Sequence, residues 1–367
     1  MGNRRSTLEG LEMNSAFWEN KRVFITGHTG FKGGWLSLLL QRLGANVYGY
    51  SLSPPTNPSL YESAGVSSGL TAEYIADLSN SGRLKEAVQN SEPDIVIHLA
   101  AQPLVRQSYV DPVETYATNV MGTINTLEAI KTSHPVKAAL FISTDKCYEA
   151  SEQEQGLSET DALGGHDPYS SSKACLELAV SSWRRSFLEK AGVAVATARA
   201  GNVIGGGDWA GDRLVPDFFR SHFAGSSLRV RYPQAIRPWQ HVLEPLNGYL
   251  LLLERLITDG AEFAEGWNFG PRDEDIKPVS WVIDKLSSSM IGTAWTAENS
   301  AQPHETGCLC LNSKKARTRL GWTPQWTLKR TLSETAEWYS AWQEKQDMRK
   351  FTLGQIDKFL AGVEDHD

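Results

Sequence analysis

The sequence predicts an α/β fold in which helices cover both faces of a doubly wound parallel sheet and a smaller C-terminal lobe follows. Short runs of apolar and β-branched residues alternate with segments of helical periodicity from residue 22 to about residue 203. Strands that are buried on both faces of a parallel sheet have such continuous apolar runs. After about residue 204 the alternation weakens and Gly, Pro and Trp become frequent, which indicates a more irregular second part.

The strands are predicted from five apolar runs, and the helices from the spacing between them. The runs are 22–27, 46–50, 94–101, 137–144 and 193–203. Between the first two, apolar residues from Trp35 to Leu43 recur at three- and four-residue intervals, and Gly44 follows as a natural helix stop. A further short strand is expected before Asp77, and residues 245–257 are expected to form a helix that returns to the sheet.

The composition narrows the classes of partner. With 41% hydrophobic residues among 367 and a formal net charge of -7, the chain can bury a large core and lacks the clustered basic face that binds nucleic acid. No apolar stretch is long enough to cross a membrane, and the first residues lack the apolar core of a signal peptide. We therefore expect a cytoplasmic protein with neither a nucleic-acid nor a membrane partner.

The cysteines do not suggest a metal site. Cys147, Cys175, Cys308 and Cys310 include no Cys-x-x-Cys pair, and no histidine lies at zinc-site spacing from them. We expect reduced thiols and no bound metal.

The alternation pattern also predicts how the chain divides. The first, larger part is expected to use residues 14–203 with a return segment at about 239–266. The second, smaller lobe is expected to use 204–238 and 267–345, and flexible tails are expected at 1–13 and 362–367.

A glycine-rich turn, "TGHTGFKG" at 26–33, follows the first predicted strand. Gly27, Gly30 and Gly33 have no side chains to keep a pyrophosphate away from the backbone amides, and the helix N-terminus that follows favours its negative charge. A simple tight turn between strand and helix is the alternative interpretation. The strand before and the helix after favour a dinucleotide site.

The identity of the dinucleotide depends on the end of the second strand. An acidic residue about twenty positions after the turn would hold the adenine ribose, but Ser51 and Ser53 stand there. No Arg or Lys follows that strand to neutralise a 2'-phosphate, so NAD is favoured over NADP, although Lys32 inside the turn could change this choice. Asp77 and Leu78 are placed to meet the adenine, unless Asp77 is an ordinary surface residue.

Tyr169 and Lys173, in "YSSSK", are four residues apart and share one face of a predicted helix. The ammonium can stabilise a phenolate and lower the tyrosine pKa from about 10 toward the working pH. Such a tyrosine takes a proton from a sugar hydroxyl while hydride leaves the same carbon. A solvated helix face is the alternative, and the position downstream of the glycine turn favours the catalytic interpretation.

Thr144, Asp145 and Lys146 follow a run of apolar residues that predicts a buried strand. An acid and a base side by side at the end of such a strand can protonate a leaving group and remove a proton. The alternative is a helix N-cap followed by a surface ion pair.

Taken together, these motifs give the chain a resemblance to the extended short-chain dehydrogenase/reductase family over nearly its whole length. The resemblance rests on "TGHTGFKG", "HLAAQ", "ATNVMGT", "STDKCY", "YSSSK" and "ARAGNVIGGGDW". Within that family the chain is most similar to the CDP-glucose 4,6-dehydratases, through "GHTGFKGGWL", "PPTNPSLYE", "GGGDWAGDRLVPD" and "IRPWQHVLEPLNGYL". The resemblance implies a Rossmann-type domain, tightly held NAD and a nucleotide sugar, CDP-glucose, as substrate.

The resemblance also implies which residues serve each ligand. The residues expected to hold NAD are Gly27, Gly30, Phe31, Lys32, Gly33, Asp77, Leu78, Leu99, Ala100, Ala101, Asn119, Tyr169 and Lys173. The residues expected to hold the substrate are Gln102, Asn202, Arg213, Arg237 and His241. The two arginines could grip the pyrophosphate as planar donors, or each could belong to a structural ion pair.

The implied reaction is oxidation at sugar carbon 4, elimination of water across carbons 5 and 6, and return of hydride to carbon 6. Asp145 suits protonation of the departing 6-hydroxyl, and Lys146 suits removal of the carbon 5 proton. Thr144 would share the 4-hydroxyl with Tyr169. A dehydratase of another nucleotide sugar, a 4-epimerase and a non-catalytic NAD-sensing protein are the alternatives. A homodimer or homotetramer is the family's usual assembly.

Overall fold

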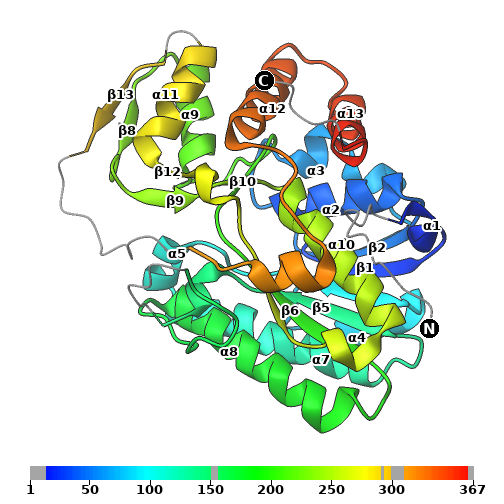
Figure 1. Ribbon diagram of the computed structural model, residues 1–367. Helices are drawn as coiled ribbons and strands as arrows, with labels where there is room; N and C mark the ends of the chain where they lie inside the picture. The colour runs from blue at the N-terminus through cyan, green and yellow to red at the C-terminus, as the bar shows by residue number, and fades with distance from the viewer. Residues whose placement is uncertain (1–13, 150–155, 291–292, 299–309, 363–367) are drawn as a thin grey trace, which may run out of the picture.

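The computed structural model describes residues 14–149, 156–290, 293–298 and 310–362 (Figure 1). The tails predicted at 1–13 and 362–367 lie outside these residues, except for residue 362. A parallel sheet with helices on both faces forms the centre of the described chain, so the predicted fold class is confirmed.

Seven parallel strands form the central sheet. They are β1 (Arg22–Thr26), β2 (Asn46–Ser51), β3 (Ala72–Ile75), β4 (Ile95–His98), β5 (Ala138–Ile142), β6 (Ala194–Ala200) and β11 (Gly266–Phe269). Their order is β11-β6-β5-β4-β1-β2-β3, so the chain runs outward from β1 in one direction and then from β4 in the other. Every residue of β4, β5 and β6 is buried, as the apolar runs predict.

Helices cover both faces of this sheet. Those packed on it are α2 (Phe31–Arg42), α4 (Ser81–Ser91), α7 (Gly122–Lys131), α8 (Pro168–Trp183) and α10 (Leu243–Thr258). Alternate residues of a strand point to opposite sides. Val23 and Ile25 of β1 therefore join one core with α2 and α10, whereas Phe24 joins a second core with α4, α7 and α8. Figure 1 shows α10 and α8 on opposite sides of the sheet.

Shorter elements connect and extend this centre. The other helices are α1 (Ser15–Trp18), α3 (Leu60–Ser63), α5 (Val105–Val110), α6 (Pro112–Tyr116), α9 (Leu214–Phe223), α11 (Val279–Ser289), α12 (Leu328–Gln343) and α13 (Met348–Leu360). The 3-10 and π segments are η1 (Val66–Gly69), η2 (Ala117–Met121), η3 (Asp145–Cys147), η4 (Arg184–Leu188), η5 (Gly260–Phe263), η6 (Asp273–Asp275) and η7 (Ala316–Leu320).

Three small strand pairs follow β6, as expected for a more irregular second part. β7 (Val203–Ile204) pairs with β10 (Gln240–His241), β9 (Ile236–Pro238) with β12 (Ile276–Pro278), and β8 (Leu228–Val230) with β13 (Trp295–Ala297). In Figure 1 the β8 and β13 pair lies beside α9 and α11, away from the large sheet. β11 belongs to the large sheet, which therefore extends past the boundary expected at residue 266.

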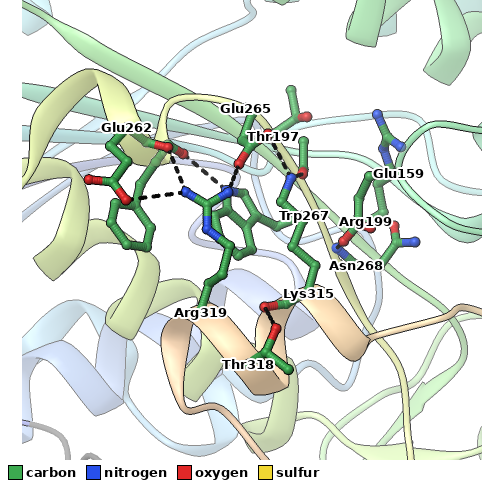
Figure 2. Close-up of polar contacts among 12 residues, drawn as sticks. Glu159, Thr197, Arg199, Glu262, Glu265, Trp267, Asn268, Lys315, Thr318 and Arg319 are labelled. Atoms are coloured by element: carbon green, nitrogen blue, oxygen red, sulfur yellow. Dashed lines mark hydrogen bonds and ion pairs between the residues drawn. The ribbon is translucent and has the colours of Figure 1, made fainter.

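Side chains form hydrogen bonds with backbone groups of β11, which is an edge strand of the sheet (Figure 2). The Lys315 ammonium donates to the Gly266 carbonyl at 2.8 Å. The Asn268 amide donates to Oε1 of Glu159 at 2.9 Å. An edge strand with unpaired backbone groups is a template for further strands, and these side chains remove part of that template.

Trp267 of β11 is fully buried under a layer of cations. Its ring stacks on Phe263 with 5.7 Å between centroids, and the Lys315 ammonium lies 4.4 Å from its ring centre. The Arg319 guanidinium lies 5.3 Å from the same ring and pairs with Glu265, as Figure 2 shows. A cation is attracted to the face of an aromatic ring through the ring quadrupole. Lys315 and Arg319, at the start of η7 and within it, therefore hold this segment against the edge of the sheet.

The part of the chain that the structure describes contains no helix long and apolar enough to cross a membrane. Cys147 and Cys175 are free thiols, as expected. Cys310 is disulfide-bonded, so the expectation of a reduced thiol is wrong for this residue. Cys308 lies outside the described residues.

Replacing Trp267 by alanine should lower the free energy of unfolding by about 3 to 5 kcal/mol, because it empties a fully buried indole site and removes the partner of two cations. Urea denaturation followed by circular dichroism measures this loss. Trp295→Ala is the matched control, because Trp295 is only half-buried, and it should cost about 1 kcal/mol or less. Equal losses in the two variants would contradict this account of the sheet edge.

Candidate active site

One cavity of about 980 Å³ lies at the carboxyl edge of the central sheet. Residues that directly follow β1, β2, β3, β4, β5 and β6 all line it, and so do residues of the segment from 200 to 217 and of β8. In doubly wound sheets ligands bind in this crevice, where the strand order reverses. Here the reversal falls between β1 and β4.

The glycine turn between β1 and α2 forms one wall of the cavity. Gly27 has φ +81°, and a Cβ on it would lie 2.7 Å from the Ala100 nitrogen. A Cβ on Gly33 would lie 2.0 Å from the Gly27 carbonyl oxygen, so neither position accepts a side chain. A Cβ on Gly30 would meet only the Gly27 oxygen at 3.4 Å, which leaves space on the cavity side. This tight turn at the start of a twelve-residue helix fits a pyrophosphate.

The remaining predicted dinucleotide residues, apart from Asn119, also line the cavity. They are Phe31, Lys32, Asp77, Leu78, Leu99, Ala100, Ala101, Tyr169 and Lys173. Ser51 lies at the end of β2, where its hydroxyl is 2.8 Å from that of Thr29. The cavity residues that follow β2 carry no charge, so this wall offers nothing to neutralise a 2'-phosphate.

Asn119 and Gln102 brace the loop after β4 and are not among the cavity residues. The Asn119 side chain accepts from the Gln102 amide at 2.8 Å and donates to Ser172 of α8 at 2.9 Å. The Gln102 side chain donates to Thr115 and accepts from the Leu104 amide. Their polar atoms are used within the fold, so they position the loop that carries Leu99, Ala100 and Ala101.

Tyr169 and Lys173 enter the cavity from α8. Asp167 caps this helix by accepting from the Ser170 amide at 2.9 Å, and Pro168 stands in its first turn. Lys173 donates to the Ile142 carbonyl at 3.1 Å. Burial raises the pKa of Tyr169 to about 12 and lowers that of Lys173 to about 8. The expected lowering of the tyrosine pKa is therefore not found, because desolvation outweighs the neighbouring charge.

Asp145 and Lys146 lie in the single turn η3 at the end of β5, and Thr144 is the N-cap of that turn. The Thr144 hydroxyl donates to Oδ1 of Asp145 at 2.8 Å and accepts from the Lys146 amide at 3.4 Å. Burial raises the pKa of Asp145, and neighbouring Lys146 opposes that rise. The Asp145 side chain is buried and Lys146 is half-buried, so the alternative of a surface ion pair does not describe this turn.

Lys32 adds a half-buried cation to this wall. Its ammonium donates to the Tyr249 hydroxyl at 3.5 Å. Burial, together with the charges of Arg213 and Lys173, lowers the pKa of Lys32 to about 8. An anionic ligand in the cavity would favour the charged form of this side chain.

The cavity is also rich in arginine. Asn202, Arg213 and Arg237 line it as predicted, and Arg213 also pairs with Asp208 at 2.8 Å. Sequence reasoning missed Arg229 and Arg231, which line the same cavity in and directly after β8. The alternating "LRVRY" of residues 228–232 was the available signal, because it puts two arginines on one face of a strand.

His241, predicted to hold substrate, is not among the cavity residues. It is fully buried between Trp35 and Trp326, with ring centroids 5.6 and 4.8 Å away. Its Nδ1 accepts from the Leu243 amide, and burial lowers its pKa to about 3. The structure therefore places this residue in the core behind the site, as a neutral cap at the start of α10. No group of metal ligands is found among the described residues.

Comparisons with known proteins show the family of the chain. The family model for GDP-mannose 4,6 dehydratase matches residues 24–335. CDP-glucose 4,6-dehydratase of Salmonella typhimurium is 48% identical over 353 residues, which covers 95% of this chain and 98% of that protein. dTDP-glucose 4,6-dehydratase of Xanthomonas campestris pv. campestris is 24% identical and covers 86% of this chain and 92% of its own.

Solved structures share the fold. UDP-glucose 4-epimerase from Stenotrophomonas maltophila, solved with bound NAD and formylated UDP-arabinopyranose, is similar with a TM-score of 0.78 and 20% identity. The match covers 89% of this chain and 99% of the epimerase. Since the family model matches most of its length and the Salmonella enzyme is 48% identical, the chain belongs to the nucleotide-sugar 4,6-dehydratases of the GDP-mannose 4,6 dehydratase family.

Proposed function

We propose that this protein converts CDP-glucose to CDP-4-keto-6-deoxyglucose and uses NAD as its cofactor. The observation that carries the proposal is that one cavity is lined by the glycine turn, by Tyr169 and Lys173, and by the acid and base of the η3 turn. A nucleotide-sugar 4-epimerase needs the first two of these features but not the third. The 48% identity to a CDP-glucose 4,6-dehydratase supports CDP-glucose among nucleotide sugars.

Tyr169 and Thr144 are placed for the first step. The tyrosine, once ionised, takes the proton of the sugar 4-hydroxyl, and Thr144 donates to the same oxygen. NAD, held by the glycine turn and the loop of residues 99–101, would accept the hydride from carbon 4 and supply it to carbon 6. Lys173 stands one turn after Tyr169 on α8 and is buried, and its positive charge would stabilise the phenolate.

Asp145 and Lys146 are placed for the elimination. The carbon 4 ketone makes the carbon 5 proton acidic, so Lys146 in its neutral form can remove it. Asp145, whose raised pKa favours the protonated form, gives its proton to the departing 6-hydroxyl, which leaves as water. Lys146 then returns its proton to carbon 5. The proton that Tyr169 took from the 4-hydroxyl then restores Asp145, so the acid is ready for the next turnover. Oδ1 of Asp145 accepts from the Thr144 hydroxyl at 2.8 Å.

The arginines that line the cavity suit the diphosphate of the nucleotide. They include Arg213, Arg229, Arg231 and Arg237. Planar guanidinium groups bind phosphate oxygens in pairs, and several of them offset the two negative charges of the substrate. We propose that the segments 204–238 and 267–345, apart from the residues of β11 that belong to the large sheet, form the lobe that holds this nucleotide, and that 14–203 with 239–266 holds the cofactor.

An assembly of two or four copies is also proposed. Large apolar side chains are exposed on α5, α6, η2 and α8, namely Tyr109, Val110, Val113, Met121 and Leu178. Exposed apolar groups on neighbouring helices suit burial against a second copy of the same surface. The assembly and a cytoplasmic location stay predictions.

The reaction itself is tested by the mass of the product. Purified protein with NAD should remove one water from CDP-glucose and leave dTDP-glucose, UDP-glucose and GDP-mannose unchanged, as mass spectrometry can follow. Loss of water from another nucleotide sugar would support the proposed dehydration but contradict CDP-glucose as the substrate. A CDP-sugar of unchanged mass would contradict the dehydratase assignment.

Replacing Lys146 by methionine should abolish elimination, with a fall in product formation of about a thousandfold, because methionine cannot accept the carbon 5 proton. Oxidation at carbon 4 should remain, since Tyr169 and Lys173 are untouched. Rapid-mixing absorbance of the reduced nicotinamide separates the two steps. Lys190→Met, at an exposed position, should behave as the wild type, and unchanged product formation by Lys146→Met would disprove the assignment.

Replacing Asp145 by asparagine should stabilise the protein at neutral pH while it removes the acid. The folded-state pKa of Asp145 lies above its unfolded value, so the folded state binds the proton more tightly and stability falls as pH rises through that interval. Asparagine has no such charge, so the gain should appear near neutral pH and vanish below about pH 4. Thermal melting at both pH values measures this gain in stability. A variant less stable than the wild type at neutral pH would contradict the conclusion that the buried carboxylate destabilises the fold.

A further inference from the structure

A buried ion pair lies directly behind the acid and base turn. Arg199 of β6 donates from Nε to Oε1 of Glu177 at 2.8 Å and from Nη2 to Oε2 at 2.9 Å. Both side chains are almost fully buried, and neither is among the cavity residues. Two charges removed from water are stable only when their geometry is good and their other polar atoms are satisfied.

The third arginine nitrogen reaches the end of the η3 turn. Nη1 of Arg199 donates to the hydroxyl of Tyr148 at 2.5 Å, and that hydroxyl donates to Oδ1 of Asn268 at 2.8 Å. Tyr148 is the residue that follows η3, so its ring is attached directly to the turn that carries Asp145 and Lys146. Figure 2 labels Arg199 and Asn268, which come from the neighbouring strands β6 and β11.

The other half of the pair belongs to the helix of the catalytic tyrosine. Glu177 stands one turn after Lys173 on α8 and accepts a further hydrogen bond from Thr197 of β6 at 2.6 Å. Its negative charge also raises the pKa of Lys173 against the effect of burial. One end of the network thus holds α8 and the other end holds the η3 turn, and both ends are fixed to β6.

From these contacts we propose that Tyr148, Arg199 and Glu177 are positioning residues. They hold the η3 turn, which carries Asp145 and Lys146, in place relative to Tyr169 and Lys173. The inference rests on the proposed dehydration. Oxidation and elimination act on adjacent sugar carbons, so Asp145 and Lys146 must reach carbons 5 and 6 while Tyr169 stays at carbon 4. An error of about 1 Å in such an arrangement costs about a hundredfold in rate. None of the three side chains lines the cavity, so the network acts through the position of the turn and, from Glu177, through its charge on Lys173.

The test is Tyr148→Phe, which removes one hydroxyl and keeps the ring. The turn loses its link to Arg199 while α8 keeps its link through Glu177, so elimination should slow by about tenfold and KM should change by less than about twofold. Reduced nicotinamide should accumulate during turnover, because oxidation continues while elimination lags. A variant with wild-type kcat and wild-type reduced nicotinamide would overturn the proposal.

Two matched variants separate positioning from general loss of stability. Thr197→Val removes a hydroxyl of the same network on the α8 side, so it should not raise the reduced fraction of the cofactor. Thr352→Val removes a buried hydroxyl that accepts from Trp338 at 2.9 Å in α13, outside the cavity residues, and should leave kcat unchanged. An equal fall in kcat for Thr352→Val and Tyr148→Phe would mean that the effect is only structural.

A crystal structure of Tyr148→Phe tests the positioning without any substrate. The turn of residues 145–147 should shift or lose order while α8 keeps its place on the sheet. An unmoved turn would overturn the inference, whichever nucleotide sugar the wild type accepts. Failure of the wild type to release water from any sugar would instead count against the proposed function.

Discussion

The parallel pairing of β1 with β4 is the contact on which the site depends. Its register places Thr26 beside His98, so the glycine turn and the loop of residues 99–101 begin side by side. The Thr26 hydroxyl lies 2.8 Å from Nδ1 of His98 and accepts from the Ala100 amide at 3.3 Å. This is also where the strand order reverses, so the helices after β1 and β4 diverge and leave the crevice open.

Burial of charge is the second constraint. Asp145 and Lys173 are buried and Lys32 is half-buried, and in each case burial is the largest cause of the shift in pKa. The cost of keeping these groups dry favours the neutral forms, which are a protonated acid and amines that release a proton near pH 8. The desolvation that destabilises the folded state therefore also prepares these groups for proton transfer.

Much of this could be predicted from the sequence, because strand order and strand ends follow from local patterns. The apolar runs predicted the strands, and motifs at strand ends necessarily meet at one edge of a parallel sheet. The direction of a polar side chain does not follow from its type. His241, Gln102 and Asn119 carry the right chemistry for a ligand, yet their polar atoms are directed to backbone amides and to Ser172 within the fold.

Long-range effects were also beyond sequence reasoning. The spacing of Tyr169 and Lys173 predicted a lowered tyrosine pKa, but the depth of burial, which no local pattern encodes, raised it to about 12. The pairing of Arg199 with Glu177 joins a strand to a helix 22 residues earlier in the chain, and only the packed fold brings the two together.

The capped edge at β11 has a consequence for how copies of this chain can combine. Lys315 and Glu159 occupy backbone groups of that strand, so a further strand cannot hydrogen-bond to the Gly266 carbonyl or the Asn268 amide. A second copy that extended the sheet at this end would have to break both contacts first.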